Sequence, residues 1–113
     1  MAIEVIGSGP FSTVRRKNGT TALAALTFVK ENAGVLAAAG DAQTTPILGV
    51  AHPSGASEYG FVYMEGQFKV DAAAGVNFAE GDLVFLASST TLDAGSADDL
   101  PIGRVINSDP ASA

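Results

Sequence analysis

The residue types that most often carry enzyme chemistry are scarce in this chain. Among its 113 residues there is no cysteine and one histidine, His52. A zinc site or a catalytic triad requires several converging donors, which a lone imidazole without a thiol cannot supply. His52 also ends an apolar run and precedes Pro53, a position more typical of a structural histidine.

Carboxylates are the remaining candidates for chemistry, but their spacing forms no recognisable site. Asp93, Asp98 and Asp99 share one polar loop, yet they lack the spacing and the final glutamate of an EF-hand. Two carboxylates that meet in space could perform acid–base catalysis, but nothing in the sequence selects a pair among the 12 acidic residues. The chain also lacks a nucleophile elbow and a phosphate-binding loop. We therefore predict that the protein is not an enzyme and has no catalytic residue, no metal and no cofactor.

Charge in this chain is sparse and mostly negative. A net charge of −6 disfavours nucleic acid as a partner, because phosphate binding requires clustered positive charge. No apolar run reaches the roughly 18 residues of a membrane span, so we expect no membrane partner. Only 16% of residues are charged and the mean hydropathy is +0.28, whereas well-behaved surfaces carry roughly 25–35% charged residues. This favours a surface partly covered by copies or by a scaffold, with a monomer rich in small residues as the alternative.

The elements that must position any functional surface are predicted to be strands. Residues 59–71 alternate aromatic and β-branched side chains on both sides of Gly66, which is typical of two half-buried strands joined by a tight hairpin turn. We expect both tyrosines of this run to lie in the core. We also expect Phe61, Phe68, Phe78 and Phe85 to share one core.

Shorter apolar runs between turn signals indicate further strands. A hairpin is predicted from residues 26–30 and 35–38 around the turn at 31–34, with a helix over 21–32 as the alternative. Asn18–Gly19 is a strong turn signal. Three more strands are expected at residues 47–51, 83–86 and 102–106.

The chain is short enough for one domain, which we divide into three segments. These are an N-terminal arm (1–19), a β-domain (20–106) and a flexible tail (107–113). The glycines and proline of 7–10 separate a short apolar segment from the domain, so we predict that this arm docks on a partner. The predicted contact residues are Ile3, Val5, Ile6, Pro10, Phe11, Arg15, Arg16 and Lys17. The alternatives are that residues 3–6 form an ordinary strand of the domain's own sheet and that the basic run is a solvated loop.

The order of these pieces resembles the phage head decoration proteins, including the lambda-type family. The resemblance runs through Glu31-Asn32-Ala33-Gly34 and the strand at 35–38, a loop at Gly40-Asp41, and the runs at 47–51 and 61–70. The later part, from 78–84 to 102–106, is similar to small capsid-decoration or head-fibre proteins of a related β type.

This resemblance implies an all-β fold, a small β-clip or β-tulip-like barrel or sandwich with little helix and an extended N-terminal arm. It implies a structural virion protein, made late in the bacterial host cytoplasm, that binds the outer face of an icosahedral head as a homotrimer. Its partners would be itself and the major capsid protein, and its role would be to cement the shell. The alternative is a generic β-rich binding module, carbohydrate-binding or adhesin-like, although the absence of tryptophan argues against a sugar-binding face.

Overall fold

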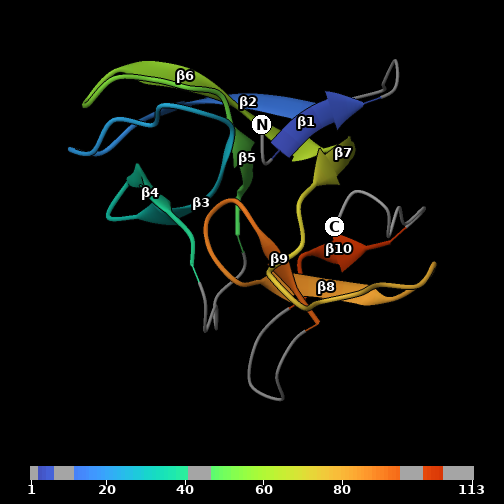
Figure 1. Cartoon of the computed structure of the whole chain (residues 1–113). Coiled ribbons are helices and arrows are strands. Elements are labelled where there is room, and N and C mark those ends of the chain that lie inside the picture. Colours follow the sequence, from blue (N-terminus) through green and yellow to red (C-terminus); the bar gives the residue numbers. More distant parts are fainter. Residues whose placement is uncertain (1–2, 7–11, 41–46, 95–100, 106–113) are drawn as a thin grey trace.

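The computed structural model describes residues 3–6, 12–40, 47–94 and 101–105. Within these ranges the chain forms ten β-strands and no helix (Figure 1). The prediction of a small all-β domain is therefore confirmed. The described residues include no helix long and apolar enough to cross a membrane.

A five-stranded antiparallel sheet dominates the fold, in the order β2-β6-β5-β3-β4 (Figure 1). Its strands are β2 (Ser12–Lys17), β6 (Tyr59–Glu65), β5 (Gly49–Ala51), β3 (Thr27–Asn32) and β4 (Val35–Ala38). The two edge strands meet at one end, where Asn18 forms a parallel bridge with Leu36. The backbone N–H of Gly19 also donates to the Leu36 carbonyl at 3.1 Å. The sheet is therefore a barrel that is closed at this end.

The interior of the barrel is filled by aliphatic side chains, with no aromatic ring in the buried cluster. Val29 and Val62 have no exposed surface, and they pack in one buried cluster. The other buried members of this cluster are Leu23, Leu36 and Ala51. A barrel with few strands has a narrow interior, so it accommodates valine and alanine more easily than aromatic rings.

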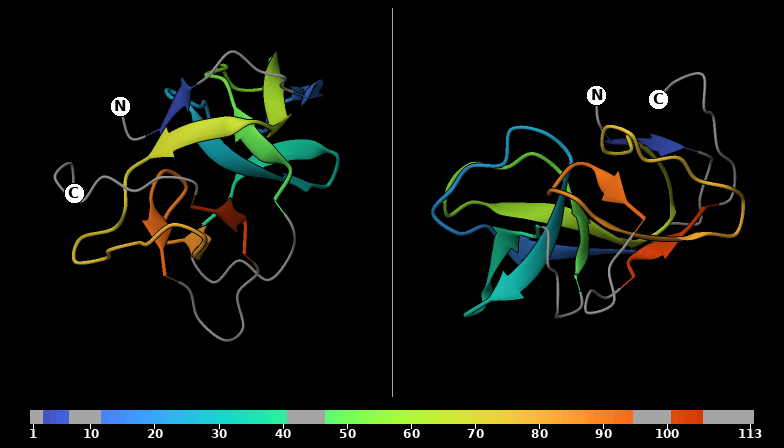
Figure 2. Two further views of the ribbon diagram at one scale, coloured as in Figure 1. Left: turned by 90° about the vertical axis from the view of Figure 1, so that its right-hand side faces the viewer. Right: turned by 60° about the horizontal axis from the view of Figure 1, so that its bottom comes forward.

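A second layer of short strands covers part of the barrel's outer surface. It contains a two-stranded ribbon of β1 (Ile3–Ile6) with β7 (Gln67–Val70), and a small sheet in the order β10-β8-β9. The strands of that small sheet are β8 (Leu83–Leu86), β9 (Leu92–Asp93) and β10 (Gly103–Arg104). Figure 2 shows these orange and red strands lying to one side of the blue and green barrel. A second buried cluster lies between the layers and comprises Ile3, Leu26, Phe28, Ala39, Val50 and Leu86.

Asn18 fastens the closed end of the barrel. Its side chain is 2% exposed, and Nδ2 donates to the carbonyls of Thr21 at 2.9 Å and of Gly55 at 3.1 Å. Oδ1 accepts from the Gly19 N–H at 2.8 Å, while the Asn18 N–H donates to the Glu58 carbonyl at 2.8 Å. The predicted turn residue is thus a buried amide that joins two loops and an edge strand.

The hairpin predicted from residues 26–38 is confirmed as β3 and β4. The strands pair from Asn32 with Val35 onward, so Ala33 and Gly34 form a two-residue loop. Their φ angles are 53° and 84°, and positive values at both positions are what a type I′ turn requires. The alternative helix over 21–32 is wrong, because β3 occupies half of that range.

The hairpin predicted within 59–71 is wrong in its pairing, although both strands exist. β6 pairs with β2 and β5, whereas β7 pairs with β1. Between them Gly66 has a φ of 149°, a conformation that favours glycine, and there the chain passes from the barrel to the second layer. β6 and β7 therefore follow each other along the chain with a bend between them, and they do not pair with each other as a hairpin.

The orientation predicted for the aromatic side chains of β6 is inverted. Val62 points into the barrel, and Phe61 is 56% exposed on the outer face. Tyr59 is 59% exposed, so it does not lie in the core. The alternation was correct, but a shift of one residue exchanges the two faces of a strand.

The prediction that four phenylalanines share one core is also wrong. Phe68 packs against the second cluster, but Phe78 and Phe85 are only half-buried and are not among the residues of either cluster. Among the described phenylalanines it is Phe28 that is buried, at 6% exposure.

The described residues of the predicted N-terminal arm belong to the domain's own sheets. β1 pairs with β7 along its length, and Ile3 is 1% exposed in the second cluster. β2 pairs with β6 from Ser12 to Lys17. The structure therefore shows the alternative, a strand of the domain, for Ile3–Ile6. The predicted tail at 107–113 lies outside the described residues.

Replacing Asn18 with alanine should destabilise the fold. The substitution removes the hydrogen bonds of a buried side chain with the Thr21 and Gly55 carbonyls and the Gly19 N–H, and at about 0.5–1.5 kcal/mol each we expect a loss of about 1–3 kcal/mol. Urea unfolding of Asn18→Ala measures this, with Asn77→Ala, an exposed loop asparagine, as the control. Equal stability losses in the two variants would contradict the role given to Asn18.

Gly49→Ala should also destabilise the barrel, because a Cβ at this position would overlap the backbone carbonyl oxygen of Tyr63. The paired strands must then shift apart, and we expect a loss of about 1–3 kcal/mol. Gly40→Ala is the matched control, since a Cβ there meets no atom within 4 Å. Thermal and urea unfolding of both variants give the comparison. A Gly49→Ala protein as stable as Gly40→Ala would show that β5 does not approach β6 this closely.

Candidate functional site

The outer face of β2 and β6 carries two paired rows of side chains. Alternate residues, including Val14 and Val62, pack against the barrel cluster, so the intervening residues lie on the outside. The residues of this outer face are Thr13, Arg15 and Lys17 of β2 and their Cα partners Tyr63, Phe61 and Tyr59 of β6. We term these six residues the aromatic–cationic face.

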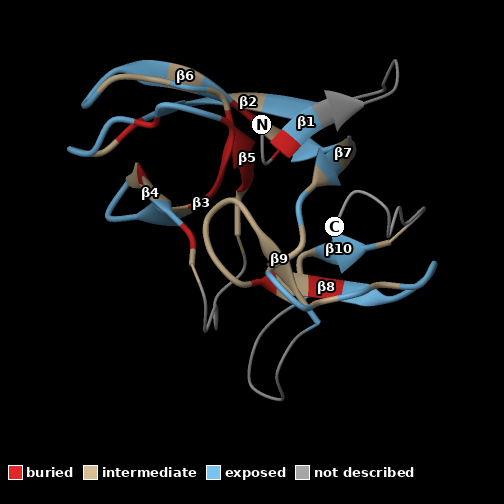
Figure 3. Ribbon diagram, in the orientation of Figure 1, coloured by how far each residue is buried: buried red, intermediate tan, exposed pale blue. Residues whose placement is uncertain are grey.

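Two aromatic side chains of this face are largely open to solvent. Tyr59 is 59% exposed and Phe61 is 56% exposed, the highest values among the large hydrophobic residues that the structure describes. Figure 3 shows β2 and β6 mostly in the colour of exposed residues, in contrast to the buried β5 beside them. Covering such rings is worth roughly 25 cal/mol per Å² of apolar surface, so a group of exposed aromatic rings is a candidate interaction surface.

Arg15 lies over the ring of Tyr59. Its guanidinium carbon is 4.9 Å from the ring centroid, within the range of a cation–π interaction. At an exposed position this contact is worth about 0.5–1 kcal/mol. The contact places the positive charge of Arg15 directly beside an exposed aromatic ring.

Tyr63 connects the exposed end of this row to the interior. Its ring centroid is 4.9 Å from that of His52 and 5.7 Å from that of Phe68, with an edge-on arrangement in the second pair. Phe68 packs in turn against the second buried cluster. His52 therefore has a packing role in this row.

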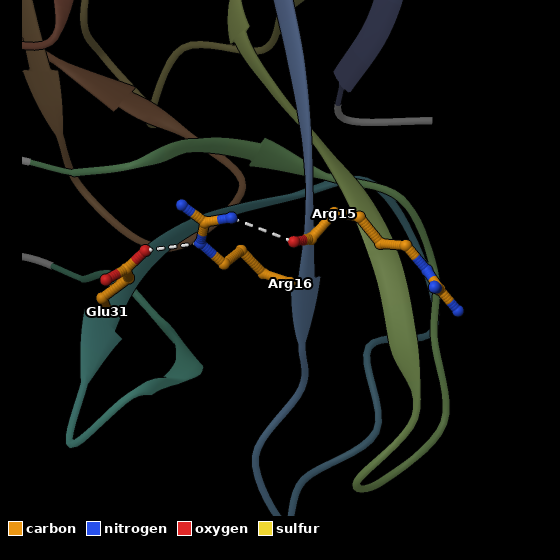
Figure 4. Close-up of polar contacts among 3 residues, drawn as sticks. All are labelled: Arg15, Arg16 and Glu31. Atoms are coloured by element: carbon orange, nitrogen blue, oxygen red, sulfur yellow. Dashed lines mark hydrogen bonds and ion pairs between the residues drawn. The ribbon is translucent and has the colours of Figure 1, made fainter.

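The basic run at 15–17 is divided between two faces of β2. Figure 4 shows Arg15 and Arg16 pointing to opposite sides of the strand. Arg16 Nε donates to Glu31 Oε1 at 2.9 Å, and Arg16 Nη1 donates to the Arg15 carbonyl at 3.0 Å. Both partners of the ion pair are 44–45% exposed, so the pair adds little stability. Only Arg15 and Lys17 of this run share the face with the exposed aromatic rings.

The other predicted contact residues do not gather with these. Ile3 is buried in the second cluster, and only the backbone of Val5 and Ile6 is described. Pro10 and Phe11 lie outside the described residues. Sequence reasoning missed the two exposed rings of β6, Tyr59 and Phe61. The sequence did contain a signal for their exposure. Tyr59 and Phe61 alternate with Gly60 and Val62, whose smaller side chains fit a narrow barrel interior better than aromatic rings do.

The described residues provide no arrangement for metal chemistry. They contain no group of three or more histidine, cysteine, aspartate or glutamate side chains placed to hold a metal ion. What the aromatic–cationic face offers is an apolar centre with positive charge beside it. Such a surface can bind another macromolecule.

The family model for phage cement proteins matches residues 14–113. The chain belongs to the phage cement protein family. The match confirms the resemblance to capsid decoration proteins, and it covers all strands from β2 onward except the first two residues of β2. No curated protein and no solved structure matched the chain.

Membership of this family indicates a structural role in stabilising a phage capsid. It implies that the protein binds the capsid and is located in the virion, and it points to a protein that is not an enzyme. All residues of the aromatic–cationic face except Thr13 fall within the matched region.

Proposed function

We propose that this protein is a decoration protein that binds the outer face of an icosahedral phage head as a homotrimer. It contacts the major capsid protein and cements neighbouring capsid subunits together. It is made in the host cytoplasm late in infection, before it joins the head. The observation that carries the proposal is the family match over residues 14–113.

The surface composition supports this role. Only 16% of the residues are charged, and the structure leaves two aromatic rings of β6 open to solvent. Contacts of standard size cover about 800 Å² on each partner. Contacts of this size with a capsid subunit or with another copy would remove the exposed rings of Tyr59 and Phe61 from water.

The cementing effect follows from linked binding equilibria. A protein that binds only the assembled shell stabilises it by an amount that grows with the ratio of free concentration to dissociation constant. If three chains bind as one unit, engagement of the first raises the effective concentration of the other two, so the trimer binds far more tightly than one chain. Subunits bridged in this way must break additional contacts before they can separate.

A carbohydrate-binding module is the second candidate, and one observation favours it. Tyr59 and Phe61 are exposed, and sugar-binding faces use exposed aromatic rings. However, Arg15 already covers the Tyr59 ring, which leaves less of it for a sugar. The family match also favours the capsid role.

Purified protein should bind phage heads that lack it and raise their thermal transition temperature. Co-sedimentation and differential scanning calorimetry of the heads measure both effects. Native mass spectrometry should show a species of three times the 11.3 kDa chain mass. Failure to bind heads, together with binding to a glycan array, would replace the proposed function with the second candidate. Binding to heads as a monomer would contradict only the trimer.

A further inference from the structure

We infer that the aromatic–cationic face is the surface that docks on the head, and that it covers an acidic patch of a major capsid subunit. This inference rests on the proposed function and specifies the contact surface within it. It replaces the N-terminal arm with the outer face of β2 and β6 as the main site of contact.

The two exposed rings are suited to the centre of an interface. Tyr59 and Phe61 are two residues apart on β6, so both side chains project from the same face of the strand. Tyrosine, phenylalanine and arginine are enriched at the centres of protein interfaces, where a few residues supply most of the binding free energy. The face combines all three types, because Arg15 lies on the Tyr59 ring.

The charge of the face is opposite in sign to that of the whole protein. The chain has a net charge of −6, yet Arg15 and Lys17 lie beside the exposed rings. Within the described residues neither of these cations forms an ion pair, whereas Arg16 is paired with Glu31 on the opposite side of β2. A local positive charge on an acidic protein orients it toward a negative partner surface and repels wrong orientations. The chemistry of the face therefore fits an acidic surface.

The backbone beneath the face is held by regular strand pairing. The face lies on two strands paired from Thr13–Tyr63 to Lys17–Tyr59, and Asn18 fixes the end of β2 directly after Lys17. Side chains held by a regular sheet and by a cation–π contact lose little conformational entropy when they bind. Preorganised aromatic side chains of this kind are suited to tight docking.

The composition of the face favours a capsid subunit over a second copy of this chain. Interfaces between obligate copies resemble a divided core and are more apolar than interfaces between partners that fold separately. Here a guanidinium lies directly on one of the two central rings. Mixed aromatic and cationic surfaces are typical of partners that fold separately and then dock, as a protein that binds an assembled head must do.

The test compares two charge reversals at neighbouring positions. Arg15→Glu changes the aromatic–cationic face, whereas Arg16→Glu makes the same change on the other side of β2. We expect Arg15→Glu to weaken binding to heads by about tenfold or more at low salt, and Arg16→Glu to leave it nearly unchanged. Wild-type binding should weaken as salt rises, and Arg15→Glu should reduce this dependence.

Removal of both rings tests the apolar part of the face. The double variant Tyr59→Ala with Phe61→Ala should bind heads at least about 30-fold more weakly, the loss expected for interface hot spots. Leu83→Ala, which removes an apolar side chain 45% exposed on β8, is the control and should bind normally. Urea unfolding and native mass spectrometry of every variant separate docking from folding and from oligomerisation.

The outcomes distinguish the inference from the proposed function. If wild-type protein binds heads and both face variants bind equally well, the face is not the docking surface, although the protein still decorates the head. If the face variants lose their oligomeric mass while staying folded, the occupant is a second copy and the inference is overturned. If wild-type protein does not bind heads, the proposed function fails and the inference fails with it. Should the double variant unfold, Arg15→Glu, a change at an exposed site, still decides the question.

Discussion

The hydrogen bonds of the buried Asn18 amide are the constraint on which the rest of this structure depends. They fix the chain at Gly19 against the loops at Thr21 and Gly55, and the Gly19 N–H in turn donates to the Leu36 carbonyl of β4, so the five-stranded sheet becomes a barrel with an inside and an outside. Without that closure β2 would be a free edge strand, paired with β6 alone among the described strands. Since β2 carries Arg15 and Lys17, the same closure places the cationic half of the aromatic–cationic face.

The size of the barrel explains why the aromatic rings lie outside. Its narrow interior is filled by Val29, Ala51 and Val62, and the second layer covers the outer surface over β3 and β5. The second layer does not cover the outer face of the barrel at Tyr59 and Phe61, so both rings are exposed to water. The exposed face is therefore a consequence of how the core is packed, and its rigidity comes from the same strands.

Local signals in the sequence predicted much of the fold. The all-β class, the β3–β4 hairpin with its turn at Ala33–Gly34, and strands in the regions of β5, β8 and β10 all follow from runs and turn residues within a few positions of each other. The family could also be inferred from the order of these pieces, and the match over 14–113 confirms it. These features share one property, since each depends on residues that are neighbours along the chain.

Features that depend on distant partners were predicted poorly. Period-2 alternation identifies two faces of a strand, but it does not say which one is buried, so Phe61 was assigned to the core. The pairing of β7 with β1 joins segments about 65 residues apart, and no local pattern reveals it. The aromatic–cationic face was half predicted: Arg15 and Lys17 were proposed as contacts, but the rings beside them were placed inside.

A cryo-EM map of a phage head decorated with this protein is the most direct test of how it binds. Cement action through the aromatic–cationic face predicts that the outer side of β2 and β6 rests on a capsid subunit, with carboxylates of that subunit near Arg15 and Lys17. It also predicts that Tyr59 and Phe61 are covered in the bound state. A map in which this face is open to solvent, while another surface of the protein contacts the shell, would contradict it.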